Sequence, residues 1–408
     1  MKNIFAAFIL SSVLMSASAQ QVNDMVSMTA GYSEQVFYSL SDGEVGTASL
    51  AAWDFAFTTN PFDAAIFVND NLGIQIYEYL GPIADWETLD TAGMLSEPLH
   101  NSELNWSEGA FNRSQTLSGT PFDYGWGQYN PITHIVNGNR IFIMDFLDGS
   151  SRKMLIQSLN LGVFTVKYAM LDGSAEQTLT VDGGDYGTKN FWYLDIETAT
   201  VLDLEPDADS WDISFTRYSS EIIPGAYYIV AGALQNKDIE ATEAAGLPAN
   251  EAIWTDYTMS ADKNIIGYDW KYFNMETFSW ELPDSLSYFV KDQAGNVWQI
   301  AFTGFGGSST GNIEFTKELV SITSLDEYER MAIQVFPNPN DGNFQWILPA
   351  DMEGATWNLI DMSGRMIQQG RTLNSGNQSM HLQELSEGIY LLQLIKGQFI
   401  AQERIIIR

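Results

Sequence analysis

The chain has 408 residues, a formal net charge of −33 and no cysteine. A surface this acidic repels phosphate backbones, which argues against DNA or RNA as a partner. The absence of cysteine excludes disulfide scaffolds, zinc–thiolate sites and thiol nucleophiles, so each domain must be held by its own hydrophobic core.

The first 19 residues have the features of a secretory signal peptide. Lys2 supplies a short positive region, residues 4–15 are apolar, and residues 17–19 form an A-x-A cleavage site before Gln20. The apolar run is shorter than the roughly 20 residues of a membrane helix, and no later segment approaches that length. We therefore expect residues 1–19 to be removed on export and the mature chain to have no transmembrane span.

A motif repeated after 158 residues organises the body of the chain. The pattern W-D-x-[AS]-F-T occurs at residues 53–58 and again at residues 211–216, and an aromatic strand precedes each copy, at residues 36–40 and 191–194. Self-similarity of this kind indicates a duplicated structural unit. We predict an all-β body of two tandem antiparallel modules, residues 20–182 and 183–325, followed by a linker at residues 326–330.

The repeated motif should lie on a core strand of each module. Side chains alternate between the two faces of a strand, so Trp53, Phe55 and Phe57 are expected to share one buried face, as are their counterparts in the second copy. The Asp of each motif is expected to cap a turn or to bond neighbouring backbone.

The W-D-x-[AS]-F strand resembles a strand of the HmuY-like family of secreted haem-binding proteins. The second copy is more similar, because residues 288–300 and the hairpin that ends at Phe315 also follow the family pattern. The resemblance implies haem held by two axial side chains, which are His in some members and Met in others. His100 and His134, the latter in an expected strand at residues 131–136, are the candidate haem ligands. Ligation by Met stays open, although Met in a β core more often fills gaps.

Other patterns point less directly to chemistry. Residues 124–129 combine two Tyr and one Trp with glycines, which suits a loop that binds a carbohydrate or a hydrophobic ligand. The acidic residues at 203–209 and 182–185 do not fit a calcium-binding EF-hand, so we interpret them as solvated turns. Residues 307–311 spell G-x-S-x-G, but a strand follows where a nucleophile elbow needs a helix. Since no catalytic constellation is marked, we expect a protein that is not an enzyme.

The segment from Met331 to Arg408 has a pattern of its own. P-N-P-x-x-G begins at Pro337, D-x-x-G-R ends at Arg365, and L-x-x-G-I-Y-L-L-x-L begins at Leu385. Short strands that alternate with turn dipeptides predict a small antiparallel β-sandwich. The ordered motifs resemble the type A C-terminal sorting domain of the type IX secretion system of the Bacteroidetes. The motif residues are Pro337, Asn338, Pro339, Gly342, Gly364, Arg365, Gly388, Ile389 and Tyr390.

The sorting resemblance implies recognition of residues 331–408 by the type IX machinery and export through the periplasm, to the medium or to the outer-membrane surface. From the resemblance of the body to the HmuY-like family, we predict that the exported protein is not an enzyme and binds haem or another small hydrophobic ligand. The alternative is a structural or adhesion protein of the surface with no small-molecule ligand, and a hydrolase is the weakest hypothesis. A cavity between the Trp53 and Trp211 modules would be the most informative structural feature.

Overall fold

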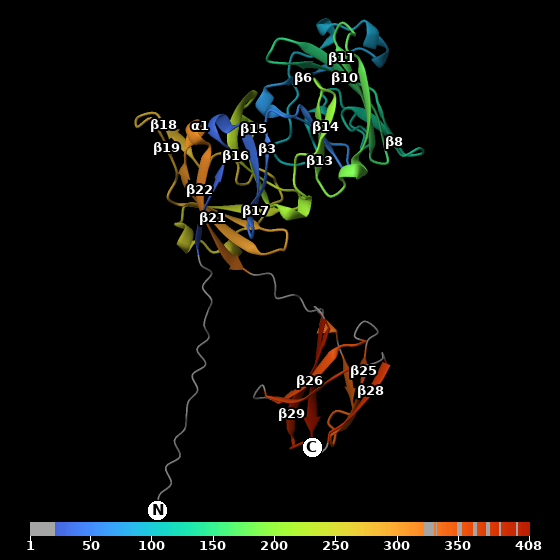
Figure 1. Ribbon diagram of the computed structural model, residues 1–408, viewed down its shortest axis with the longest axis vertical. Coiled ribbons are helices and arrows are strands. Elements are labelled where there is room, and N and C mark those ends of the chain that lie inside the picture. The colour runs from blue at the N-terminus through green and yellow to red at the C-terminus, as the bar shows by residue number, and fades with distance from the viewer. Residues whose placement is uncertain are drawn as a thin grey trace, which may run out of the picture. The chain divides into compact units, whose positions relative to one another are not determined.

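The computed structural model describes residues 21–321, 330–331, 333–348, 353–361, 365–372, 376–382, 385–396 and 399–408. The predicted signal peptide, most of the predicted linker and Gly364 lie outside these ranges. The chain divides into two compact units between residues 321 and 322, and the sheets of both units are antiparallel apart from the pairing of residues 330–331 with residues 400–401, which is parallel (Figure 1). The all-β prediction is therefore confirmed.

Sandwich I is formed by one continuous part of the first unit, residues 53–204. Its strands are β4 (Phe55–Thr58), β5 (Ile66–Val68), β6 (Gln75–Tyr79), β7 (Gly127–Asn130), β8 (Ile135–Gly138), β9 (Ile141–Asp145), β10 (Ser151–Asn160), β11 (Val163–Met170), β12 (Gln177–Asp182), β13 (Phe191–Asp195) and β14 (Thr200–Leu202). One sheet has the order β14-β13-β4-β5, and the other runs β12-β11-β10, where β10 pairs with both β9 and β8. Phe57 and Trp192 stack at 4.2 Å between ring centres in the core between the sheets.

Sandwich II combines the beginning of the first unit with its end. Its strands are β1 (Val22–Ser27), β2 (Glu34–Ser39), β3 (Gly43–Ser49), β15 (Ile213–Ile223), β16 (Ala226–Gln235), β17 (Glu240–Ala245), β20 (Leu286–Lys291), β21 (Val297–Phe305) and β22 (Asn312–Ser321). The sheets have the orders β3-β2-β15-β16 and β1-β22-β21-β20-β17. The one-turn helix α1 (Gly307–Thr310) joins β21 to β22, and β18 (Tyr272–Asn274) with β19 (Ser279–Glu281) forms a separate two-stranded ribbon.

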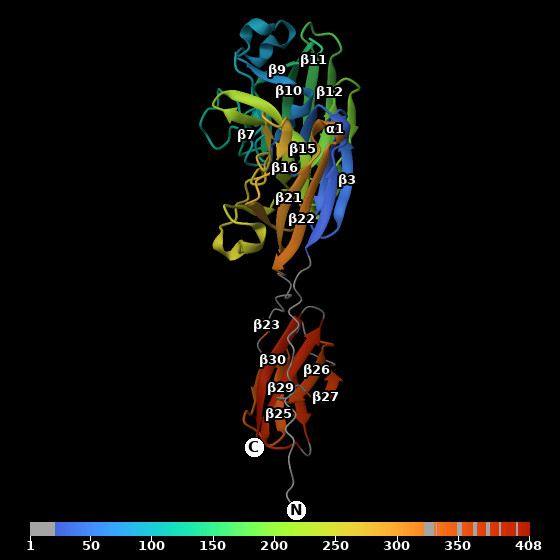
Figure 2. The same cartoon turned by 90° about the vertical axis from the view of Figure 1, so that its left-hand side faces the viewer.

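The two sandwiches have the same strand order, and the N-terminal strands complete the second one. β4 and β5 correspond to β15 and β16, β13 and β14 to β2 and β3, and β12-β11-β10 to β1-β22-β21. Figures 1 and 2 show the blue N-terminal strands beside the orange and olive strands of sandwich II. The first unit is thus a duplication whose second copy is closed by strands from the start of the chain.

This closure departs from the predicted module boundary between residues 182 and 183. The chain leaves β12, turns through the 3₁₀ segment Gly183–Tyr186 and returns to the edge of β4, so β13 pairs with β4 across that boundary. The equivalent edge of β15 is covered by β2 instead. The aromatic strand that precedes each W-D motif therefore pairs with the other copy of the motif.

The two Phe side chains of the first motif lie on one buried face, as predicted, but the Trp side chain lies on the opposite face. Phe55 and Phe57 are fully buried in the core of sandwich I. Trp53 precedes the first residue of β4, so strand alternation does not extend to it, and it packs edge-on against Tyr193 at 5.0 Å on the opposite face. Trp211 packs in the same way against Phe37 at 5.1 Å. The two Trp side chains thus belong to the layer between the sandwiches.

The two motif aspartates bond the backbone of the paired strand. Asp54 Oδ2 accepts a hydrogen bond from the Ile196 amide at 2.8 Å, and Asp212 Oδ2 accepts one from the Leu40 amide at 2.7 Å. This equivalence confirms the role predicted for the aspartates. Each one fixes the aromatic strand that precedes the other copy of the motif in the sequence.

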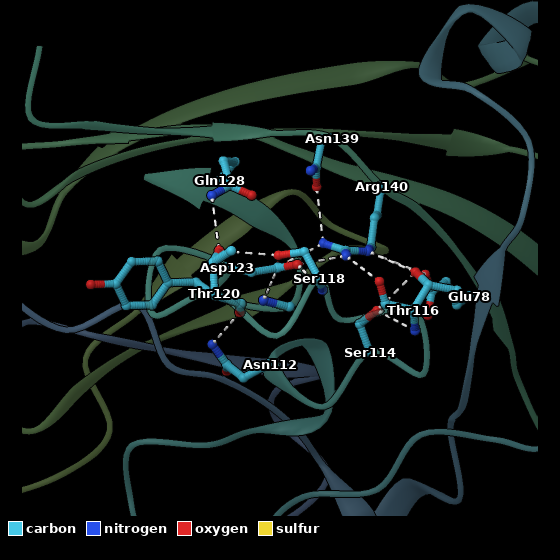
Figure 3. A network of polar contacts seen from close by, with 12 residues as sticks. Glu78, Asn112, Ser114, Thr116, Ser118, Thr120, Asp123, Gln128, Asn139 and Arg140 are labelled. Atoms are coloured by element: carbon cyan, nitrogen blue, oxygen red, sulfur yellow. Dashed lines mark hydrogen bonds and ion pairs between the residues drawn. The ribbon is translucent and has the colours of Figure 1, made fainter. Parts of the chain in front are cut away.

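A buried ion-pair network holds the long connection between β6 and β7 (Figure 3). The Arg140 guanidinium donates two bonds of 2.9 Å to the Asp123 carboxylate and lies 3.2 Å from Glu78 Oε1. Glu78 Oε2 also accepts bonds from Ser114 Oγ and the Gln115 amide. The carboxylate side chains of Asp123 and Glu78 are only 1% and 2% exposed, so this network is a structural anchor of the connection.

The second unit is a small β-sandwich, as predicted. Its strands are β23 (Arg330–Met331), β24 (Gln334–Phe336), β25 (Asn343–Leu348), β26 (Thr356–Asp361), β27 (Met366–Arg371), β28 (Gly376–His381), β29 (Gly388–Lys396) and β30 (Phe399–Ile407). The sheets β23-β30-β29-β26-β27 and β24-β25-β28 enclose a core that includes Phe344, Trp346, Leu359 and Leu392. Within the described ranges, no helix of the chain has both the length and the apolar character to cross a bilayer.

Candidate functional site

A small cavity lies between the two sandwiches at the place marked by the two repeated Trp residues. Trp53, Ala56 and Tyr193 line it from sandwich I, and their counterparts Trp211, Ser214 and Phe37 line it from sandwich II. Its volume is about 90 Å³. Because a water molecule occupies about 30 Å³ of liquid, the cavity has room for about three waters or for one very small molecule. It is much too small for a porphyrin.

The amine of Lys263 lies on the wall of this cavity. The residue is 4% exposed, and its Nζ lies 4.2 Å from the ring centre of Trp106 and 4.8 Å from that of Phe67. Among the described residues, no hydrogen bond or ion pair reaches this Nζ. Burial lowers the pKa of Lys263 to about 7, against the attraction of Asp70 and Glu103.

Two carboxyl groups line the same cavity. Glu205 Oε1 accepts a bond of 2.7 Å from the Phe191 amide, and Oε2 accepts one of 3.0 Å from the Tyr193 hydroxyl. Burial raises the pKa of Glu205 to about 7. Asp70 Oδ2 accepts a bond from the Ser219 amide, and burial raises its pKa to about 6. The cavity thus holds an amine and two carboxyls that all change charge near neutral pH.

A larger hollow opens on sandwich I beside His134. We call it the His134 hollow, and it is lined by Pro61, Phe62, Ala64, Pro121, Phe122, Tyr124, Tyr129, His134, Val136, Leu159 and Leu161. Its volume is about 360 Å³, within the range of pockets that take small-molecule ligands. The Tyr129 hydroxyl lies 2.7 Å from His134 Nδ1, while Nε2 has no partner in the described part of the chain.

The His134 hollow is bordered by apolar side chains that face solvent. Phe62 is 91% exposed and Leu161 is 78% exposed. Leu161 and Gly162 form the two-residue turn between β10 and β11, with φ of +50° and +86°. Turns of this kind favour Asn-Gly, because a branched side chain is disfavoured at positive φ. Leu161 therefore lies in a conformation and an environment that both disfavour leucine.

The two predicted haem ligands occupy different surroundings. His100 is half-buried and stacks on Tyr227 at 3.6 Å between ring centres, and burial lowers its pKa. His134 was expected in a strand at residues 131–136, but this expectation is wrong. It is the last residue of the four-residue turn between β7 and β8, with φ of +60°. Neither residue lines a hollow with the other, so ligation of haem by this pair stays a prediction without support from their positions.

The acidic stretches predicted as solvated turns differ from each other. Asp182 Oδ1 accepts a bond from the Gly184 amide in an exposed turn, as expected. Glu205, by contrast, is 4% exposed and lines the cavity. Its carboxyl accepts hydrogen bonds from the Phe191 amide and the Tyr193 hydroxyl, both on β13, so the prediction of a solvated turn is wrong for this residue. Within the described ranges, no three His, Asp or Glu side chains come close enough together to hold a metal ion.

Most motif residues of the C-terminal unit sit where the chain turns. Asn338 bonds the backbone of Arg404 and Ile406 through its side chain, and Gly342 has φ of +96°, which favours glycine. Arg365 Nε lies 3.0 Å from Asp361 Oδ2, and the Tyr390 hydroxyl donates to the Ser386 carbonyl. Pro337 and Pro339 are exposed between β24 and β25, while Gly388 and Ile389 begin β29.

Comparison with known proteins identifies the C-terminal unit. Residues 334–408 match the family described as "Secretion system C-terminal sorting domain". No curated protein matches the chain. Among solved structures, PorZ, described as a surface component of the type-IX secretion system of Porphyromonas gingivalis, is 9% identical over 77% of this chain and 50% of its own, with a TM-score of 0.17. A biofilm-associated protein BSP domain is 10% identical over 97% of this chain and 67% of its own, with a TM-score of 0.16.

The chain spans half the length of the PorZ chain. The sorting domain predicted from the P-N-P, D-x-x-G-R and G-I-Y motifs is confirmed, whereas the HmuY-like modules are not. A sorting domain of this family directs export to the cell surface or the medium through the type IX machinery.

Proposed function

We propose that this exported protein binds a small, mainly apolar molecule in the His134 hollow and that it is not an enzyme. The observation that carries the proposal is a hollow of about 360 Å³ whose lining is apolar or aromatic except for the His134 ring and the Tyr hydroxyls. Ligand pockets combine apolar walls with a few placed polar groups in this way. The inter-sandwich cavity, at about 90 Å³, is too small for the same role.

The exposed leucine at the rim supports a ligand-contacting role. An Asn at position 161 would suit both the positive φ of the turn and its exposure to water. A residue kept against its conformational and solvation preferences is typical of a functional contact. Phe62, on the neighbouring turn, is the other strongly exposed apolar side chain of the lining.

Haem is the ligand that the family resemblance suggests, and it can be tested here. The hollow offers one imidazole, because His100 does not line it. A haem bound there would take one axial ligand from His134, whose Nδ1 contact with Tyr129 leaves Nε2 available. Other planar or aliphatic molecules of similar polarity need no axial ligand.

Binding can be measured on the mature chain, residues 20–408. We would titrate the protein with hemin and, separately, with the apolar fluorophore anilinonaphthalene sulfonate. The wild type should bind at least one of them saturably, and Leu161→Asn should weaken that binding at least tenfold. Leu147→Asn is the matched control, since Leu147 is 82% exposed on a different turn and lines neither the His134 hollow nor the inter-sandwich cavity.

Two results would contradict the proposal. The first is equal affinity of the Leu161→Asn variant and the wild type, which would place binding elsewhere. The second is no saturable binding of either probe by a protein that unfolds cooperatively. That second result would favour the alternative of a structural or adhesion protein of the cell surface.

A further inference from the structure

The backbone of Lys263 is fixed by hydrogen bonds, and the residue lines the cavity between the sandwiches. Its amide donates to the Leu104 carbonyl at 2.8 Å, and its own carbonyl accepts a bond of 2.7 Å from the Gln235 amide. The Trp106 indole N–H donates to the Gln235 carbonyl at 2.8 Å, which fixes the ring beneath the lysine. The backbone and the aromatic wall are thus both fixed, and the amine lies over Trp106 and Phe67.

A second buried lysine of sandwich II shows what is unusual about this one. Lys271 is 7% exposed and its Nζ lies 3.9 Å from the Trp270 ring centre. Its amine, however, donates to the Ala231 carbonyl at 2.6 Å and to the Tyr268 carbonyl at 3.1 Å. Lys263 has the aromatic contacts without any such acceptor in the described part of the chain. Its lone pair is therefore free to react whenever the amine is uncharged.

We propose that the inter-sandwich cavity captures a small aldehyde or ketone as an imine of Lys263. The Nζ lone pair attacks the carbonyl carbon, and a proton moves from nitrogen to oxygen to give a carbinolamine. The hydroxyl then leaves as water while the nitrogen lone pair forms the C=N bond. One amine and one carbonyl compound give one imine and one water, and no oxidant or reductant is needed.

The other groups of the cavity suit this reaction. The Asp70 carboxyl lines the same cavity and can give a proton to the departing hydroxyl and receive one from nitrogen. Asp70 and, from outside the cavity lining, Glu103 favour the protonated amine, which cannot attack a carbonyl, but burial and Arg113 oppose them and lower the pKa of Lys263. A volume of about 90 Å³ limits the ligand to about three or four non-hydrogen atoms. The site is separate from the His134 hollow, so it does not depend on the function proposed above.

Reductive trapping of the folded wild-type protein tests the proposal directly. The mature chain would be treated with acetaldehyde and sodium cyanoborohydride at pH 7, and ethylated lysines would be located by peptide mass spectrometry. Lys263 should be ethylated at least tenfold faster than Lys291, whose side chain is 44% exposed. Lys271, buried but hydrogen-bonded, should stay unmodified. Benzaldehyde, with about twice as many heavy atoms as the cavity accepts, should modify Lys291 but not Lys263.

Three outcomes would overturn the proposal. They are an unmodified Lys263 in a protein whose Lys291 is labelled, equal rates at Lys263 and Lys271, or equal rates at Lys263 with acetaldehyde and benzaldehyde. Asp70→Asn should slow trapping at Lys263 without changing the rate at Lys291. If both rates are unchanged, the role assigned to Asp70 is wrong.

Discussion

Replacing Glu205 with Gln should stabilise the protein at alkaline pH and have little effect at acidic pH. Glu205 is 4% exposed, and burial raises its pKa from 4.5 to about 7. The folded state therefore binds the Glu205 proton more tightly than the unfolded state does. Below pH 4.5 both states are protonated and the carboxyl carries no penalty. As pH rises from 4.5 to 7, the folded state loses stability relative to the unfolded state.

The size of this penalty follows from the pKa difference. Each pKa unit corresponds to about 1.4 kcal/mol, so ionised Glu205 costs the folded state about 3 kcal/mol at pH 8. A Gln side chain can keep the bond from the Phe191 amide, and the Tyr193 hydroxyl can turn to accept from its amide group. The variant thus removes the charge while keeping the shape of the wall.

The assay is urea unfolding of the wild type and the variant at pH 4 and pH 8, followed by tryptophan fluorescence. The stability gained by Glu205→Gln should be about 3 kcal/mol larger at pH 8 than at pH 4, and other titrating groups cancel in this comparison. The exposed carboxylate Glu251, changed to Gln, should show no such difference. An equal effect of Glu205→Gln at both pH values would refute the reasoning that burial controls this carboxyl.

Three further predictions concern other parts of the chain. Arg140→Met should cost about 3–5 kcal/mol in urea unfolding, because it leaves two buried carboxylates unpaired, and a loss below 1 kcal/mol would contradict the anchoring role. Leu161→Asn should raise stability by about 1 kcal/mol, and destabilisation would show that Leu161 is a packing residue. Deleting residues 331–408 should leave the body in the periplasm in a fractionation experiment, and continued secretion would refute the sorting role.

The Arg140 network also explains how the protein should respond to acid. Burial would raise the pKa of Asp123, but the bonds from Arg140 and from the Ser118 and Gly125 amides outweigh it and lower the pKa to about 2. This contribution to stability is complete above about pH 4 and is lost as pH falls toward 2. Glu205 acts in the opposite direction at higher pH.

Sequence reasoning predicted the local features that depend on short patterns. The duplication was visible because Trp-Asp is rare and recurs with the same neighbours, and the β-structure followed from alternation and turn residues. The C-terminal unit was predicted from motifs within one short segment. That Asp54 and Asp212 bond backbone was also predicted, since short polar side chains beside a turn often do so, but their partners Ile196 and Leu40 lie 142 and 172 residues away and could not be predicted from the motif.

The features that sequence reasoning missed depend on contacts between distant segments. Nothing near β2 indicates that it pairs with β15 rather than β4, since both partners offer the same aromatic pattern. Lys263 gives no signal, because its environment comes from Phe67 and Trp106 of the other sandwich. The Leu-Gly turn at residues 161–162 did carry a signal, since Asn-Gly is the usual sequence there.

The closure of sandwich II by β1–β3 is the claim that places both copies of the motif around one cavity. The most direct test is to compare the unfolding cooperativity of separate fragments. Residues 53–204 should unfold cooperatively alone, and residues 211–321 should do so only when residue 321 is joined through a short Gly/Ser linker to residues 21–50. Cooperative unfolding of residues 211–321 alone, or of residues 20–182 but not 53–204, would contradict the account.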